Sequence, residues 1–172
     1  MFKLFFTVLV FNLCIVQNFA SFAYGLPFRF YHGFFYRRCN FSFIYGICGV
    51  SPQPIDTLPY KLKASGYNYN PGTTITVTID GDSFSGFYIR AFDEATREPL
   101  GSWEESTSLH AMDRCNAAIQ ADRKDKKSVE LKWNSPPGRS GRVYFKNVIM
   151  KNNTTYWSNV ILKGNKEENE KA

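Results

Sequence analysis

The strongest constraint on the fold is a run of strict alternation in the middle of the chain. Residues Thr73–Ile79 place Ile75, Val77 and Ile79 on one face and threonines on the other. A period of two built from β-branched residues is typical of a half-buried strand and does not match the 3.6-residue period of a helix. We therefore expect a sheet with one face in a hydrophobic core.

Further short runs of the same kind predict an all-β domain. Turn-forming residues separate them at 70–72, 80–82, 97–101 and 136–138. About seven short strands indicate a β-sandwich, with a small barrel as the alternative. Besides residues 73–79, the expected strands are 60–64, 84–92 (where Gly86 marks a bulge or a close approach), 102–105, 129–133, 142–150 and 156–163.

Two regions and three tryptophans complete this outline. Residues 24–59 are read as an irregular segment laid over the domain, and 105–127 have no clear pattern and leave room for a short helix. Trp133 and Trp157 lie in alternating strands and are expected in the core, whereas Trp103 is expected to be half exposed.

The first 23 residues have the form of a signal peptide. Lys3 precedes an apolar run over 4–16, and Ser21 and Ala23 occupy the −3 and −1 positions of a cleavage site. We predict cleavage after Ala23, with an uncleaved signal anchor as the alternative. The expected organisation is then a signal peptide (1–23), a domain (24–164) and a charged, disordered tail (165–172), in a secreted, extracellular protein without a lipid anchor.

The cysteines and sequons fit that compartment. After Cys14 leaves with the signal peptide, Cys39, Cys48 and Cys115 remain, so we expect one disulfide and one thiol that pairs between chains or stays buried. No spacing matches a metal site, and we expect no cofactor. The predicted glycosylation sites are Asn40, Asn152 and Asn153, of which the two adjacent ones should not both be modified.

The sequence does not indicate an enzyme. His32 and His110 are its only histidines and lie in unpatterned segments, so no convergent catalytic group is visible. Four acidic residues could bind calcium through their carboxylates, but we expect them to be turn residues. The acidic residues concerned are Asp80, Asp82, Asp93 and Glu94.

Basic residues are the best binding candidates. The net charge is +6 and the isoelectric point about 9.1, which favours anionic partners. Arg142 and Lys146 are four residues apart on an expected strand and should project to one exposed face. Anionic glycans or microbial surface polymers are the expected partners, and a merely solvated face is the alternative; neither nucleic acid nor stable membrane insertion is expected. The candidates form a loop cluster (Arg123, Lys124, Lys126, Lys127) and a second patch (Arg139, Arg142, Lys146, Lys151).

A series of short motifs runs along nearly the whole mature chain. They are Gly49–Gln53, Pro59-Tyr60-x-Leu62, Tyr69-x-Pro-Gly-x-x-Ile-x-Val-x-Ile79, Phe84-x-Gly-Phe-x-Ile-x-Ala91, Pro99-x-Gly101 with Trp103, Cys115-Asn116, Lys127-x-Val-x-Leu-x-Trp133 with Pro136 and Pro137, Gly141-x-Val-x-Phe145 and Tyr156-Trp-x-x-Val160. In their order and spacing, the chain resembles the reeler (reelin N-terminal-type) domain family. Among stand-alone members it is similar to secreted insect defense proteins.

The resemblance implies an immunoglobulin-like antiparallel β-sandwich and a disulfide between Cys39 and Cys115, which leaves Cys48 unpaired. The chain departs from the family pattern because Cys48 and Gln120 stand where the family has histidines. Pairing of Cys48 with Cys115 therefore stays open. The resemblance implies an innate immune role through binding of anionic microbial or matrix surfaces. The alternative is a matrix or structural protein that acts through protein contacts, including a Cys48-linked homodimer.

Overall fold

The computed structural model describes residues 39, 51–122, 124–152 and 154–164. The chain divides into two units, Met1–Pro52 and Gln53–Ala172, and all strands described below lie in the second. No helix in the described ranges has the length and hydropathy needed to cross a membrane.

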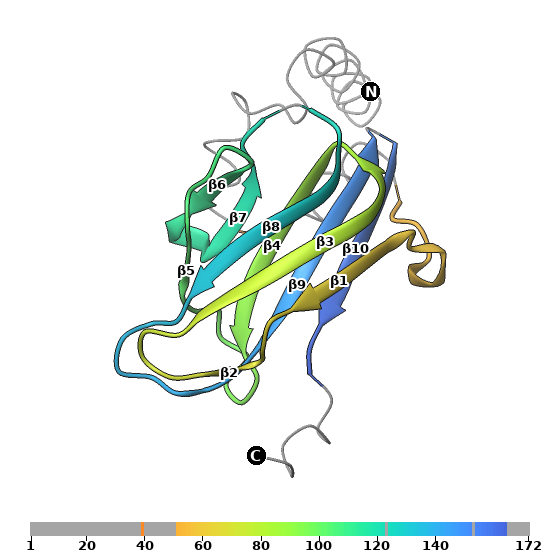
Figure 1. Ribbon diagram of the computed structural model, residues 1–172. Helices are drawn as coiled ribbons and strands as arrows, with labels where there is room; N and C mark the ends of the chain where they lie inside the picture. Colours follow the sequence, from red (N-terminus) through yellow and green to blue (C-terminus); the bar gives the residue numbers. More distant parts are fainter. Residues whose placement is uncertain (1–38, 40–50, 123, 153, 165–172) are drawn as a thin grey trace, which may run out of the picture. The chain divides into compact units, whose positions relative to one another are not determined.

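The second unit contains two antiparallel sheets, which confirms the all-β sandwich (Figure 1). The four-stranded sheet has the order β1 (Tyr60–Ala64), β3 (Thr74–Phe84), β8 (Lys126–Asn134), β5 (Ser102–Trp103). The second sheet has the order β10 (Thr155–Leu162), β9 (Gly141–Asn152), β4 (Gly86–Asp93), β7 (Ala117–Gln120), β6 (Leu109–Met112), and β2 (Asn68–Tyr69) also pairs with β9. Two 3₁₀ turns, η1 (Ile55–Thr57) and η2 (Asp113–Cys115), complete the described elements.

The core lies between the inward faces of the two sheets. Ile75, Val77 and Ile79 of β3 are at most 2% exposed, as their alternation predicts, and Trp133 of β8 is fully buried. The Trp133 ring packs edge-on against Phe145 of β9, with ring centroids 6.1 Å apart, so aromatic rings join the two sheets.

Most expected strands are confirmed, but two segments differ from the prediction. Residues 80–82 were expected to turn, whereas β3 runs through them with a shift of register and reverses only at Ser85. Gly81 makes this path possible, because its φ is +147° and a Cβ there would lie 2.4 Å from the Pro59 carbonyl oxygen. Residues 105–127 were expected to be unpatterned with a possible helix, but they form the hairpin β6–β7 around η2.

The tryptophans follow the prediction in two of three cases. Trp133 and Trp157 are buried in the core, as expected. The expectation of a half-exposed Trp103 was wrong, because its side chain is only 5% exposed and its indole nitrogen donates to the Asn116 carbonyl at 3.2 Å. The αL conformation of Asn116 (φ +48°) ends η2 and turns that carbonyl toward the ring.

Candidate functional site

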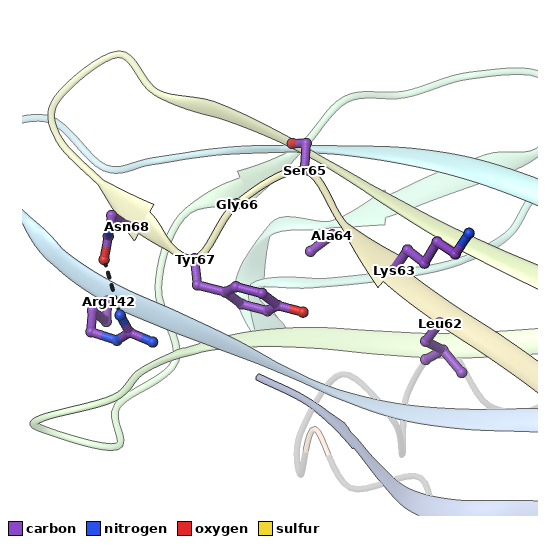
Figure 2. A pocket seen from close by; sticks show the side chains of 8 residues that line it. All are labelled: Leu62, Lys63, Ala64, Ser65, Gly66, Tyr67, Asn68 and Arg142. Carbon is purple, nitrogen blue, oxygen red and sulfur yellow. Dashed lines mark hydrogen bonds between the residues drawn. The ribbon is translucent and has the colours of Figure 1, made fainter. Parts of the chain in front are cut away.

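A hollow of about 610 Å³ lies where β1 ends and the chain turns into β2 (Figure 2). Leu62 and Ala64 of β1 point toward the core but stay partly exposed, because β1 is the edge strand of its sheet. They supply an apolar wall, and polar groups surround the rest. The lining residues are Leu62, Lys63, Ala64, Ser65, Gly66, Tyr67, Asn68 and Arg142.

Backbone bonds and close packing hold the loop of this hollow against β9. The Tyr67 carbonyl accepts the Val143 amide at 2.8 Å. The Tyr67 ring lies against Gly164, where a Cβ would approach the ring to 2.6 Å, so only glycine fits beneath it. Figure 2 shows the ring extending along the hollow toward Leu62 and Lys63. The aromatic face is therefore presented by a fixed loop.

Arg142 of β9 places a guanidinium group at the other side of the hollow. Its Nε donates to Glu94 Oε2 at 2.8 Å, and the side chain is 24% exposed. Among the described residues, its terminal nitrogens make only long contacts, 3.4 Å to Asn68 Oδ1 and 3.5 Å to the Gly164 carbonyl. A guanidinium carries five N–H groups, so donors remain for another acceptor.

Lys146 lies on the outward face of β9, in register with Arg90 of β4. Two residues along, Phe92 and Tyr144 stack with centroids 5.4 Å apart and an interplanar angle of 20°. The Arg90 guanidinium and the Lys146 ammonium lie 5.0 and 5.2 Å from the centroid of the Phe92 ring. The sheet therefore presents two cations beside an aromatic pair, and Arg90 also donates to the Cys115 carbonyl at 2.9 Å.

Arg139 faces a buried carboxylate. Its Nη2 lies 3.8 Å from Oδ2 of Asp93, a residue that is 5% exposed. Asp93 accepts the Tyr69 hydroxyl at 2.6 Å and the Ala95 and Thr96 amides at 2.9 and 2.8 Å. Burial alone would raise the pKa of Asp93, but these hydrogen bonds and the charge of Arg139 outweigh burial and lower it. Arg139 therefore forms an ion pair with Asp93, a buried carboxylate that stabilises the fold.

The loop cluster is partly neutralised by its own acid. The Lys126 ammonium contacts Asp122 and donates to the Lys124 carbonyl, and its side chain is only 9% exposed. The hydrogen bond from Lys126 lowers the pKa of Asp122. Lys124 and Lys127 are exposed, and Arg123 lies outside the described residues. The described cations of the loop cluster therefore differ in their environment, because Lys126 is paired with Asp122 whereas Lys124 and Lys127 are exposed.

The acidic residues weighed as calcium ligands have separate partners. Asp80 accepts from Ser128 and Asp82 from Lys151, whereas Asp93 and Glu94 are bound as described above. Among the residues that the structure describes, no three His, Cys, Asp or Glu side chains are grouped as metal ligands.

Cys39 and Cys115 are disulfide-bonded, which confirms the pairing implied by the resemblance. Cys48, Asn40 and Asn153 lie outside the described residues. Asn152 is exposed in the β9–β10 turn, where its Oδ1 accepts the Thr154 amide at 3.0 Å and the Thr154 hydroxyl at 3.1 Å.

Comparison with known proteins agrees with this architecture. The profile of the Reeler domain matches residues 39–169, well over half of the chain. The chain belongs to the reeler domain family. Domains of this family occur in extracellular proteins and act as binding or structural modules. The search among curated proteins returned no match.

Solved reeler domains share the fold. The crystal structure of the human F-spondin reeler domain (fragment 1) is 20% identical, with a TM-score of 0.51, and the match covers 62% of this chain and 86% of that one. The crystal structure of the Reelin-N domain of F-spondin is 21% identical, with a TM-score of 0.50, and the match covers 62% of this chain and 84% of that one. At this identity the likeness establishes the sandwich fold and leaves function to be argued from the chain's own surface.

Proposed function

We propose that this reeler domain is secreted and binds anionic polymers of microbial or matrix surfaces, as a defense protein without catalytic activity. The observation that carries the proposal is the pair Arg90 and Lys146, which stand opposite each other on adjacent strands. Like charges in that arrangement destabilise a sheet, and an anion between them would offset the repulsion. The stacked rings of Phe92 and Tyr144 beside them supply a face on which a sugar ring can pack.

The overall charge acts in the same direction. The full sequence has a net charge of +6, of which one charge, Lys3, lies in the predicted signal peptide, so the secreted chain keeps +5 (6 − 1). This charge attracts polyanions over distances of about 10 Å at moderate ionic strength, and added salt screens the attraction. Binding should therefore be fast, sensitive to salt and tolerant of the sequence of the polymer.

The test is binding of the secreted full-length chain to surfaces coated with heparin, lipopolysaccharide or neutral dextran, at low and high salt. We expect binding to the two anionic surfaces only, weakened several-fold by Lys146→Gln. The matched control is Lys132→Gln, which removes an exposed cation from the outer face of the other sheet, where Glu104 lies 3.7 Å away. No binding at low salt, or equal losses in both variants, would reject the proposal.

The alternative, a matrix protein that acts through protein contacts, predicts a different outcome. A Cys48-linked homodimer would run at twice the monomer mass on a non-reducing gel and would disappear in Cys48→Ser. A dimer without affinity for either anionic surface would favour this alternative.

A further inference from the structure

We infer that the hollow beside Arg142 is a binding site for one acidic sugar unit, a hexuronate whose carboxylate lies on the guanidinium group. The inference rests on the proposed function, because it assumes the same general class of ligand, an anionic carbohydrate. It concerns a different surface from the one that contains Arg90 and Lys146. The hollow has the volume of a small-ligand pocket, which is commonly about 300–1,000 Å³.

The net charge of the residues around the hollow favours a ligand that carries one negative charge. Arg142 and Lys63 contribute two positive charges, and Glu94, bound to Arg142, contributes one negative charge. Lys63 forms no ion pair with any described residue. The balance of +1 is neutralised by a single carboxylate, whereas a highly sulfated segment would bring more negative charge than the hollow can match.

The shape of the donors selects a carboxylate. Within the described part of the chain, the two terminal nitrogens of Arg142 hold contacts of 3.4 and 3.5 Å, so both can turn N–H groups toward a ligand at little cost. The guanidinium fork fits the two oxygens of a carboxylate. The flexible four-carbon stem of Lys63 lets its ammonium approach the same anion.

The remaining lining suits a pyranose ring. The Tyr67 ring and the apolar wall of Leu62 and Ala64 can pack against the C–H faces of the sugar. The Ser65 hydroxyl oxygen accepts the Thr76 amide at 3.0 Å, and its own proton can be donated to a sugar hydroxyl. The Asn68 amide also lines the hollow and contacts Arg142 through Oδ1.

Two methyl glycosides provide the test. Methyl β-glucuronide and methyl β-glucoside differ only in a carboxylate in place of a hydroxymethyl group, and methyl galacturonide probes a second uronate source. We would titrate each into the isotope-labelled, secreted full-length chain and follow backbone amide shifts by NMR. We expect saturable shifts at residues 62–68 and 142 with at least one uronide, at a Kd near 1 mM, and at least five-fold weaker binding of the glucoside.

Variants connect the shifts to the hollow. Lys63→Gln should weaken uronide binding at least three-fold, whereas Lys61→Gln, two residues away on the same face of β1 and outside the hollow, should leave it unchanged. Absence of saturable shifts with both uronides, binding of the glucoside as strong as that of the uronide that binds, shifts elsewhere, or no effect of Lys63→Gln would overturn the inference.

The two proposals fail separately. Lys63→Gln and Lys146→Gln are both measured on heparin and on the uronides. Retention of heparin binding together with absence of uronide binding would reject the hollow and leave the proposed function standing. The reverse result would reject the polymer-binding face and keep the hollow.

Discussion

Replacement of Tyr69 by Phe gives a sharp test of the electrostatics of the buried Asp93. The variant removes the hydroxyl that donates to Asp93 Oδ2 at 2.6 Å and keeps the ring, which packs edge-on against Trp133 with centroids 5.7 Å apart. Oδ1 keeps its two amide donors. Of the described residues, Oδ2 keeps only Arg139, whose nitrogen is too distant at 3.8 Å for a hydrogen bond.

The expected loss follows from the charge of the acceptor. A hydrogen bond to a charged group contributes about 1.5–3 kcal/mol, so the free energy of unfolding should fall by about 2 kcal/mol at pH 7. The melting temperature should fall by about 4–8 °C, since a domain of this size loses roughly 2–4 °C per kcal/mol. The measurement is urea and thermal unfolding followed by tryptophan fluorescence.

The pH dependence follows from the direction of the Asp93 pKa shift. The folded-state pKa is lower than the unfolded-state pKa, so this carboxylate stabilises the fold fully above the unfolded value of about 3.9. That contribution is lost as the pH falls through the folded value. The deficit of Tyr69→Phe should therefore shrink toward that of a neutral hydrogen bond, about 1 kcal/mol, below the folded pKa.

A second buried tyrosine provides the control. The Tyr60 hydroxyl donates to the Ser83 carbonyl, a neutral acceptor, at 3.2 Å. Tyr60→Phe should cost about 0.5–1.5 kcal/mol, with little change between pH 7 and pH 3. If Tyr69→Phe costs less than about 0.5 kcal/mol at pH 7, or no more than Tyr60→Phe does at that pH, Asp93 is not held as a carboxylate by that bond.

Three further outcomes can be measured by the same unfolding experiments. Gly101→Ala should lower the free energy of unfolding by several kcal/mol, because φ is +73° and a Cβ would lie 2.3 Å from Trp133 Nε1; a loss below about 1 kcal/mol would contradict this packing. Reduction of the Cys39–Cys115 disulfide should cost about 2–5 kcal/mol, seen as a lower urea midpoint under reducing conditions, and an unchanged midpoint would contradict it. Burial raises the pKa of Tyr88 to about 12, so its contribution to stability should be complete below pH 10 and lost as the pH rises toward 12; the difference in ultraviolet absorbance between the wild type and Tyr88→Phe should show this tyrosinate forming together with alkaline unfolding and not before it.

The alternating strands could be predicted because each has one buried and one exposed face. In β8 the buried residues are Val129, Leu131 and Trp133, and the residues between them are exposed. The alternation of apolar and polar residue types in the sequence therefore matches the alternation of buried and exposed positions. The hairpin β6–β7 escaped prediction for the opposite reason. All four residues of β7 are buried, two of them alanines and one a glutamine, so neither face is marked by a change of polarity.

The turn predicted at 80–82 was wrong because it was inferred from the local residue types alone, whereas contacts with distant parts of the chain determine the conformation there. Asp-Gly-Asp is a common turn sequence, but here Gly81 serves a close approach to Pro59 within a strand. The pairing of Phe84 with Lys126 beyond the shift of register carries the strand onward. Cross-strand partners more than forty residues away decided the outcome, and no local window contains them.

The same separation limits prediction of the site. Arg142 was identified as a cation from the sequence, but its acid, Glu94, lies 48 residues away. The hollow joins residues 62–68 to Arg142, and the contributions of Lys63 and Tyr67 become visible only when β9 is placed beside that loop. Spacing along the chain contains no signal for such a juxtaposition.

Counting basic residues also gives a poor measure of binding surface, as Lys126 and Lys146 illustrate. Both were predicted as polyanion contacts. The Lys126 ammonium, however, is paired with Asp122 and donates to the Lys124 carbonyl, whereas the Lys146 ammonium is exposed and lies over the rings of Phe92 and Tyr144. A polyanion that reached Lys126 would have to break an existing ion pair, while at Lys146 it would relieve the repulsion from Arg90. If the surface works as proposed, Lys126→Gln should change polymer affinity much less than Lys146→Gln, although the two variants alter the net charge equally. Equal losses in a heparin-binding assay would mean that total charge governs binding and that the arrangement of the face is irrelevant.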